Sequence, residues 1–337
     1  MPRTGVFNGV YFDPDVFTEY MQEQSCLNFA IIQSGILQDD PIIQKMLGNE
    51  GNVGTAPFFN PIDNEGDALN YDGKTDNTPT ELTTNKQIFM AISRMKAWKE
   101  VDFVRYLSGK SPLQNLATKL VVPYWTYQWQ KDLVATIKGI MGVTEMKTHK
   151  TDLSVTSGSI TDANKIDLNT PLRASQKAIG DKRRDFTLFI CHSTVATRLV
   201  ELNIAQNIKY TVPNAVQQIE LKQIGDMIIF ECDDLTVDNT KPEFPVYHSY
   251  MVGRGTFLKA EKKVSHPYDT DYDPEKLGGV SMLYTKQARV MHPNGFSIKA
   301  DNIVEESPTR EELANSANWE LKFNHRNVAI AEIISNG

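Results

Sequence analysis

The chain has 337 residues, 40% of them hydrophobic, so it can bury one full core and has room for two modest domains. Its formal net charge of -7 argues against a protein whose affinity comes from neutralising nucleic-acid phosphates. The sequence has no apolar run long enough to cross a membrane, no secretion signal, and three cysteines in neither a disulfide framework nor a metal-binding spacing. We therefore expect a soluble cytoplasmic protein without membrane contact.

The N-terminal part of the chain combines a predicted helix with a predicted long hairpin. Asp13 and Pro14 suit the start of a helix over residues 13–34, which ends near Gly35. Residues 48–84 are then rich in Gly, Asn, Asp, Thr and Pro and cannot close a core alone. The flanking segments TAPFF and NKQIFMAISRMKAW contain β-type residues in partial alternation, which is typical of the two sides of a hairpin.

Two helices are predicted next, a short one ended by Gly109 and a long one over residues 112–141 with Ser111 as its cap. Apolar residues recur along the long helix mostly every three or four positions, which gives it one apolar face of roughly 40 Å. Pro123 interrupts this helix and removes the hydrogen bond to the carbonyl of Lys119. A bend is therefore predicted at Pro123.

The remainder of the chain reads as a mixture of strands and helices, so the predicted fold class is α+β. Residues 144–180 are polar and turn-rich, after which DFTLFICHS predicts a buried strand that leads into the helix TVATRLVELNI. Strands are predicted on both sides of Gly225 and of Gly253, and DTDYDPEKLGG is interpreted as a loop. SMLYTKQARVMHP and NGFSIKA predict a hairpin, and NWELKFNHRNVAIAEIIS predicts two segments that end the chain inside a sheet.

The most enzyme-like motif is Cys191-His192-Ser193, because a thiol at the end of a strand and near a helix N-terminus can have a lowered pKa. Adjacent side chains rarely point at one another, however. We therefore expect Cys191 to end a buried strand and Ser193 to cap the following helix. No catalytic residue is predicted.

Other motifs lack an essential member. Gly109-Lys110-Ser111 resembles the end of a phosphate-binding loop, but Val104 stands where the first glycine is needed. The acids in DTDYDPEKLGG copy the opening of a calcium loop without its glycine and final glutamate. No two histidines have a helical chelating spacing, and the basic clusters 182–184 and 259–263 are diluted by acids and interpreted as solvated faces. No cofactor and no metal is predicted.

Taken in order, these elements resemble the major capsid proteins of tailed bacteriophages, the Hong Kong ninety-seven-like fold that encapsulin shells also use. Two stretches carry the resemblance: KAWKEVDFVRYLSGKSPLQNLATKL, which leads to a helix ending near KG, and the tail SPTREELANSANWELKFNHRNVAIAEI. The resemblance spans nearly the whole chain and rests on packing residues instead of reactive ones.

The resemblance implies an N-terminal arm (1–50), an E-loop hairpin (51–98), a P-domain with a long spine helix (99–170 and 271–300), and an A-domain with a central sheet and flanking helices (171–270 and 301–337). The arm and hairpin are expected to cover neighbouring subunits, and residues 52–84 to add little to the subunit's own core. The expected contact residues are Phe58, Phe59, Ile62, Leu69 and Tyr71. Pro123 is unexpected in a spine helix of this family.

The implied function is structural: a virion subunit that self-assembles into pentamers and hexamers of an icosahedral head around double-stranded DNA. The resemblance implies homo-oligomers, a portal, packaged DNA held without sequence reading, and a separate scaffolding protein, because no helical prodomain precedes the arm. An encapsulin-like compartment that holds protein cargo is one alternative. A cytoplasmic α+β enzyme that uses Cys191-His192 is the other.

Overall fold

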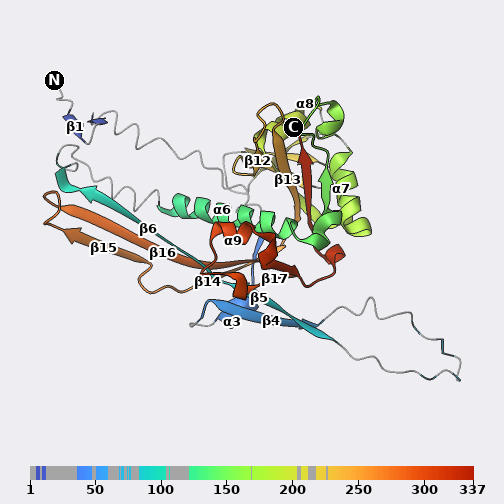
Figure 1. Ribbon diagram of the computed structural model, residues 1–337, viewed down its shortest axis with the longest axis horizontal. Helices are drawn as coiled ribbons and strands as arrows, with labels where there is room; N and C mark the ends of the chain where they lie inside the picture. The colour runs from blue at the N-terminus through green and yellow to red at the C-terminus, as the bar shows by residue number, and fades with distance from the viewer. Residues whose placement is uncertain are drawn as a thin grey trace. The chain divides into compact units, whose positions relative to one another are not determined.

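A computed structural model shows the chain as two compact units (Figure 1). The structure describes residues 5–7, 10–12, 36–47, 51–59, 68, 70, 71, 74, 76, 83–103, 106, 121–167, 169–202, 206–211, 218–224 and 227–337. Unit 1 comprises residues 1–29, 93–130 and 263–288, and unit 2 comprises residues 30–92, 131–262 and 289–337. The predicted helix over 13–34 and the first part of the predicted long helix lie outside the described residues.

Unit 2 contains a mixed sheet in the strand order β7-β19-β13-β8-β11-β10-β9, with β12 paired to β13. The strands are β7 (Lys150–Asp152), β8 (Phe186–Cys191), β9 (Gln206–Thr211), β10 (Gln218–Ile224), β11 (Met227–Glu231), β12 (Val237–Asp238), β13 (Val246–Gly253) and β19 (Ile330–Ser335). The predicted buried strand is confirmed as β8, whose apolar run FTLFIC suits a strand covered on both faces. The prediction that the chain ends inside a sheet is confirmed by β19.

Two helices, α7 (Thr170–Ile179) and α8 (Ser193–Glu201), cover one face of this sheet (Figure 1). Their apolar sides form one core with alternate residues of the strands, including Phe189, Met251 and Ile333. Helix α8 is confirmed. The sequence does not predict helix α7, because its buried face is made partly of the small residues Ala174 and Ala178, which give a weak apolar signal.

Unit 1 joins the first part of α6 (Val121–Met141) to three strands, β6 (Ile92–Val101), β15 (Tyr268–Asp273) and β16 (Val280–Pro293). Two buried tryptophans fix α6, because the indole N–H of Trp125 donates to the Thr285 hydroxyl at 3.2 Å and that of Trp129 to Gln287 Oε1 at 3.0 Å. The Thr285 hydroxyl in turn donates to the Lys96 carbonyl at 3.0 Å. The predicted long helix is confirmed over residues 121–141.

The interpretation of DTDYDPEKLGG as a loop is wrong for its first half. Residues 268–273 form β15, antiparallel to β16, and only the following turn is irregular. The alternation of Tyr and Thr with Asp is a strand period, and Tyr and Thr favour strands whatever the charge of the other face. The acidic composition hides this period.

The predicted hairpin between SMLYTKQARVMHP and NGFSIKA is also wrong. Both segments are strands, β16 and β17 (Phe296–Ile298), but β17 pairs with β18 (Trp319–Leu321). All three residues of β17 are buried, and the hydroxyl of its Ser297 accepts the backbone N–H of Ile88 at 3.0 Å. Contacts distant in sequence therefore determine the pairing of β17, and a turn signal cannot report them.

The second part of α6 belongs to unit 2 and packs closely on α9 (Arg310–Ala314). A Cβ at Gly139 would lie 2.0 Å from the carbonyl oxygen of Leu313, so only glycine fits there. The same carbonyl accepts the indole N–H of Trp319 at 2.8 Å. Two turns before Gly139 in α6, the buried Asp132 carboxylate accepts a hydrogen bond from Arg310 Nε at 2.6 Å. These contacts fix the end of the long helix to the C-terminal segment.

Candidate assembly surfaces

The hairpin predicted near residues 51–98 is present as β4 (Val53–Phe59) and β5 (Thr84–Met90). The two strands are antiparallel over their whole length, from Val53 opposite Met90 to Phe59 opposite Thr84. β6 then leaves the hairpin and pairs with β16. The β4–β5 ladder therefore ends at residue 90, and the predicted E-loop boundary at residue 98 stays a prediction.

One face of β4 is exposed, since burial alternates along the strand as expected for a half-covered sheet. Phe59 lies on this face at the end of the hairpin and is 75% exposed. Tyr71, in the segment that joins the strands, is 99% exposed. Aromatic side chains this exposed are unusual on a protein that works alone, and they mark a surface that a partner can cover.

The other predicted contact residues differ in placement. Phe58 points to the opposite face from Phe59, and its ring packs edge-to-face on Phe323 of its own chain at a centroid distance of 4.9 Å. Ile62 and Leu69 lie outside the described residues. Phe59 and Tyr71 are therefore the two members of the predicted set whose rings are open to solvent, and their contact with neighbours stays a prediction.

The base of the hairpin is part of the subunit core. Phe89 is buried in a cluster with Ile43, Ala91, Ala260 and Val290, and Ala56 packs against it. The Lys262 ammonium donates to Asn52 Oδ1 at 2.6 Å, and Asn52 Nδ2 donates to the Glu306 carbonyl at 3.0 Å. The expectation that all of residues 52–84 add little to the core is thus too broad, and for residues 60–83 it stays a prediction.

Unit 1 carries a second set of exposed apolar side chains. They are Met95, Phe103, Tyr106, Val122, Tyr268, Tyr272 and Leu277, each at least half exposed. Pro123, the site of the predicted bend, is partly buried in α6 beside exposed Val122. The carbonyl of Lys119, on which the predicted bend depends, lies outside the described residues, so the bend stays a prediction.

The motif Cys191-His192-Ser193 forms a helix cap. Cys191 ends β8 and is fully buried, and His192, not Ser193 as predicted, occupies the cap position of α8. His192 Nδ1 accepts the backbone N–H of Thr194 at 3.2 Å, while Asp233 Oδ1 accepts that of Ser193 at 3.0 Å. Ser193 Oγ lies 3.5 Å from the same Nδ1, which is a longer contact than the cap bond, so the main hydrogen bond of this nitrogen is the one that caps α8.

Two titratable groups near this motif, Asp233 and Cys232, have shifted pKa values. Hydrogen bonds from the backbone N–H and hydroxyl of Ser193 hold the pKa of Asp233 below its ordinary value. Burial raises the pKa of the nearby Cys232 thiol to about 11, so this sulfur is protonated at neutral pH and a poor nucleophile. Across the described part of the chain, no three His, Cys, Asp or Glu side chains are grouped to hold a metal ion.

A buried histidine makes the subunit sensitive to acid. His292 is buried and its Nε2 lies 2.8 Å from the Phe296 carbonyl, and burial lowers its pKa from 6.5 to about 4. The unfolded chain therefore binds this proton first, so stability is lost as the pH falls from 6.5 toward 4. From pH 6.5 to 5 we expect this residue alone to remove about 2 kcal/mol from the free energy of unfolding.

Urea unfolding of unassembled subunits at pH 7 and pH 5 measures this effect. His292→Gln keeps a donor for the Phe296 carbonyl but cannot titrate, so its stability should change less between the two pH values by about 2 kcal/mol. His149 Nδ1 lies 2.7 Å from the Ile330 carbonyl, and its pKa is also lowered by burial, so it is the matched second site. An unchanged pH dependence in His292→Gln would contradict the assignment.

The chain is similar in sequence to a known phage capsid protein. No family model matches the chain. The major capsid protein of Bacillus phage SPP1 is 26% identical over 321 residues, which cover 95% of this chain and 94% of that protein.

Among the residues that the structure describes, no helix is long and apolar enough to span a membrane.

Solved structures of phage capsids share the fold. The capsid of Ralstonia phage GP4 aligns with a TM-score of 0.52 at 9% identity, over 89% of this chain and 87% of that chain. The mature capsid of bacteriophage PhiM1 aligns with a TM-score of 0.52 at 10% identity, over 98% and 91% of the two chains. At such low identity the likeness concerns the fold, and it extends over most of the chain.

Proposed function

We propose that the chain is a major capsid subunit with the Hong Kong ninety-seven-like fold, which assembles with copies of itself into the pentamers and hexamers of an icosahedral phage head. This role requires surfaces that are completed only by a neighbour. The observation that supports it most is the hairpin β4–β5, whose base is buried in the subunit while Phe59 and Tyr71 beyond it are exposed.

The energetics of such an assembly follow from repetition. Permanent interfaces commonly bury roughly 2,000–5,000 Å² each, and a closed shell repeats every contact many times. Several moderate interfaces therefore stabilise the shell cooperatively, because a subunit that leaves must break its interfaces with all its neighbours at once. Residues 60–83 would supply one such contact by lying across a neighbouring subunit.

Further partners follow from the phage setting of the relatives. We propose that the shell assembles in the cytoplasm of a host bacterium with a scaffolding protein and a portal. It then becomes part of the virion and encloses double-stranded DNA. The subunit's net charge of -7 means that any contact with DNA must come from a local surface and not from the chain as a whole.

Sedimentation velocity of the purified chain, alone and co-expressed with its scaffolding protein, tests the proposal. A capsid subunit should give closed particles of very large mass in at least one of these conditions. A discrete monomer or small oligomer in both would favour the enzyme alternative and contradict self-assembly.

A further inference from the structure

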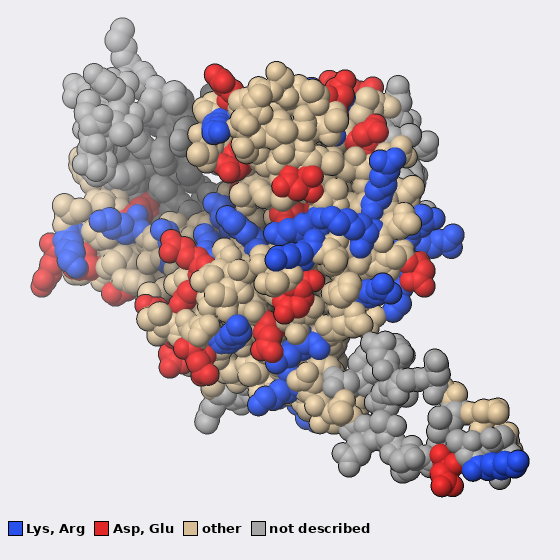
Figure 2. Space-filling view, turned by 45° about the vertical axis from the view of Figure 1, so that its right-hand side comes forward, with Lys and Arg blue, Asp and Glu red and all other residues tan. Residues whose placement is uncertain are grey.

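Basic side chains from five segments of unit 2 gather on one surface. Helix α7 contacts four other short elements: η2 (Thr144–His149), β7, η4 (Gly180–Asp185) and η7 (His325–Asn327). We name the surface they form the cationic face. Its basic residues are Lys147, Lys150, Arg173, Lys177, Lys182, Arg183, Arg184 and Arg326. Figure 2, in which this side of the molecule comes forward, shows Lys and Arg side chains in a broad band across it.

The charge of the chain is unevenly distributed. Residues 144–152, 170–185 and 325–327, which build the cationic face, contain eight Lys or Arg and four Asp or Glu. This surface therefore carries +4, and the rest of the chain must carry -11 to give the total of -7. Such a separation of charge creates a local positive potential on a protein that is acidic overall.

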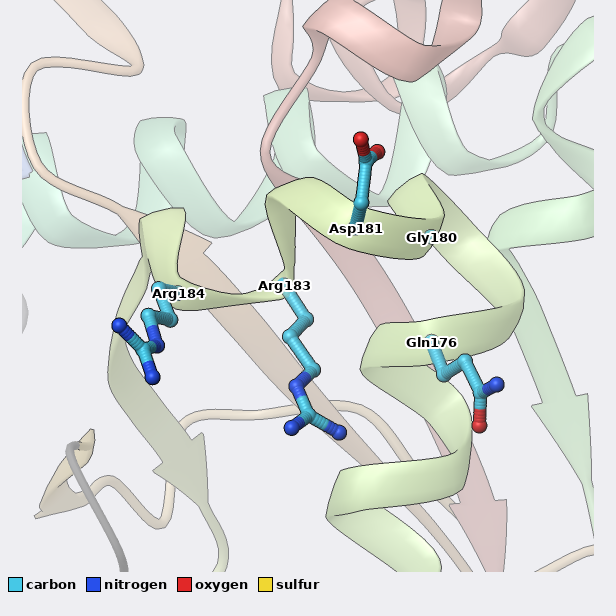
Figure 3. Close-up of a pocket in the computed structure, with 5 residues that line it drawn as sticks. All are labelled: Gln176, Gly180, Asp181, Arg183 and Arg184. Carbon is cyan, nitrogen blue, oxygen red and sulfur yellow. The ribbon is translucent and has the colours of Figure 1, made fainter.

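The cationic face also has a defined hollow. A depression of about 600 Å³ lies between α7 and η4, lined by Gln176, Gly180, Asp181, Arg183 and Arg184. Figure 3 shows the side chains of Arg183 and Gln176 extending to the same side, whereas the carboxylate of Asp181 points away from both. The one acid of the lining therefore does not neutralise the guanidinium groups within the hollow.

The two arginines of the hollow differ from the lysines beside them in their partners within the chain. Lys182 is held by Asn327 Oδ1 at 2.8 Å, and Lys177 donates to the Lys150 carbonyl. Arg183 and Arg184 are exposed, and within the described residues neither has an ion pair. A guanidinium presents several N–H donors in a plane that matches the oxygens of a phosphate, so two unpaired arginines form a suitable phosphate site.

We propose that the cationic face binds the phosphodiester backbone of double-stranded DNA, with Arg183 and Arg184 as the principal phosphate contacts. The proposal rests on the proposed capsid function and assigns this face to the inner surface of the shell. Subunits of net charge -7 would otherwise repel an enclosed polyanion, and a local +4 surface offsets that repulsion. Contacts with phosphate groups carry no sequence information, so the binding should be independent of sequence.

Fluorescence anisotropy with a labelled duplex of random sequence tests this on unassembled full-length subunits over a range of salt concentrations. Arg183→Gln/Arg184→Gln should weaken DNA binding at least tenfold at low salt. The slope of log affinity against log salt should become shallower by about 1.8, because each phosphate that an arginine neutralises adds about 0.9 to the slope. Arg183→Lys/Arg184→Lys keeps the charge and should recover most of the affinity.

The matched control removes the same charge elsewhere. Lys263 and Lys286 are exposed in unit 1, and Lys263→Gln/Lys286→Gln should change affinity less than about threefold, with the salt slope nearly unchanged. Equal decreases in affinity in both double variants would overturn the proposal, because affinity would then follow net charge alone. Wild-type affinity in Arg183→Gln/Arg184→Gln would overturn it directly.

If the partner of the cationic face were a second copy of the chain, the variants would affect assembly and not DNA binding. If Arg183→Gln/Arg184→Gln bound DNA normally but failed to assemble, the cationic face would be a contact for an acidic segment of a second copy, such as exposed β15, and the proposal would be wrong. Shell formation is measured separately by sedimentation of the wild type. Failure of the capsid function is therefore distinguishable from failure of DNA binding, which is measured on subunits.

Discussion

Replacing residues 60–83 with a two-residue Asn-Gly turn is expected to give a folded subunit that no longer forms shells. Phe59 and Thr84 are opposite each other in the β4–β5 ladder, so a tight turn can close the hairpin without moving either strand. The buried cluster around Phe89 is retained, and the subunit should unfold cooperatively with a free energy within about 1 kcal/mol of wild type. Sedimentation and negative-stain microscopy measure the loss of particles.

A second variant separates the reach of this segment from its side chains. A Gly/Ser sequence of the same length in place of residues 60–83 keeps the span but removes Tyr71 and the other side chains, and it should also fail to assemble. Intact shells from the short-turn variant would show that the segment is dispensable. An unfolded subunit would show that the segment belongs to the core.

Arg310→Met should strongly destabilise the subunit. The Nε of Arg310 lies 2.6 Å from the Asp132 carboxylate, which is fully buried in α6 at 0% exposure. Removing one partner of a buried pair commonly costs roughly 3–5 kcal/mol, and the low end applies because Arg310 itself is 38% exposed. Urea unfolding of unassembled subunits should therefore show a loss of about 3 kcal/mol, since assembly would mask it by mass action.

Three controls define the origin of this loss. Arg310→Lys keeps a cation near Asp132 and should recover part of the stability. Asp132→Leu/Arg310→Met replaces both charges with apolar groups and should be less destabilised than Arg310→Met alone. Lys322→Met removes a partner of Glu320, which is half exposed, and should cost less than about 1 kcal/mol. A loss below about 0.5 kcal/mol in Arg310→Met would contradict a role for the pair in joining α6 to α9.

Elements with a strong apolar period can be predicted from the sequence. β8 is a continuous apolar run, α6 repeats apolar residues every three or four positions, and β19 closes the chain with IAEIIS. In each case the local signal and the final burial agree, because the segment packs with the face that its own pattern defines. The order of these elements also carries the resemblance to phage capsid proteins.

Elements determined by distant contacts could not be predicted. β17 follows a clear turn signal, yet it pairs with β18 and bonds through Ser297 to β5, which lies about two hundred residues earlier. β15 is hidden because its acids suggest a loop, although their alternation with Tyr and Thr is that of a strand. Local composition is a poor guide wherever strand pairing decides the structure.

The cationic face is equally inaccessible to sequence reasoning. The cluster 182–184 alone is diluted by Asp181 and Asp185, which favours its interpretation as a solvated face. Only folding brings Lys147, Arg173 and Arg326 to the same surface, although Lys147 and Arg326 are separated by slightly more than half of the chain. A charge that is scattered in sequence and gathered in space leaves no sequence pattern.

Electron cryomicroscopy of particles assembled from the wild-type chain tests the central claim most directly. The account predicts closed shells of pentamers and hexamers in which residues 60–83 lie across a neighbouring subunit, and this neighbour covers Phe59 and Tyr71. Shells in which this segment folds back onto its own subunit, or a preparation that contains no shells with or without a scaffolding protein, would contradict it.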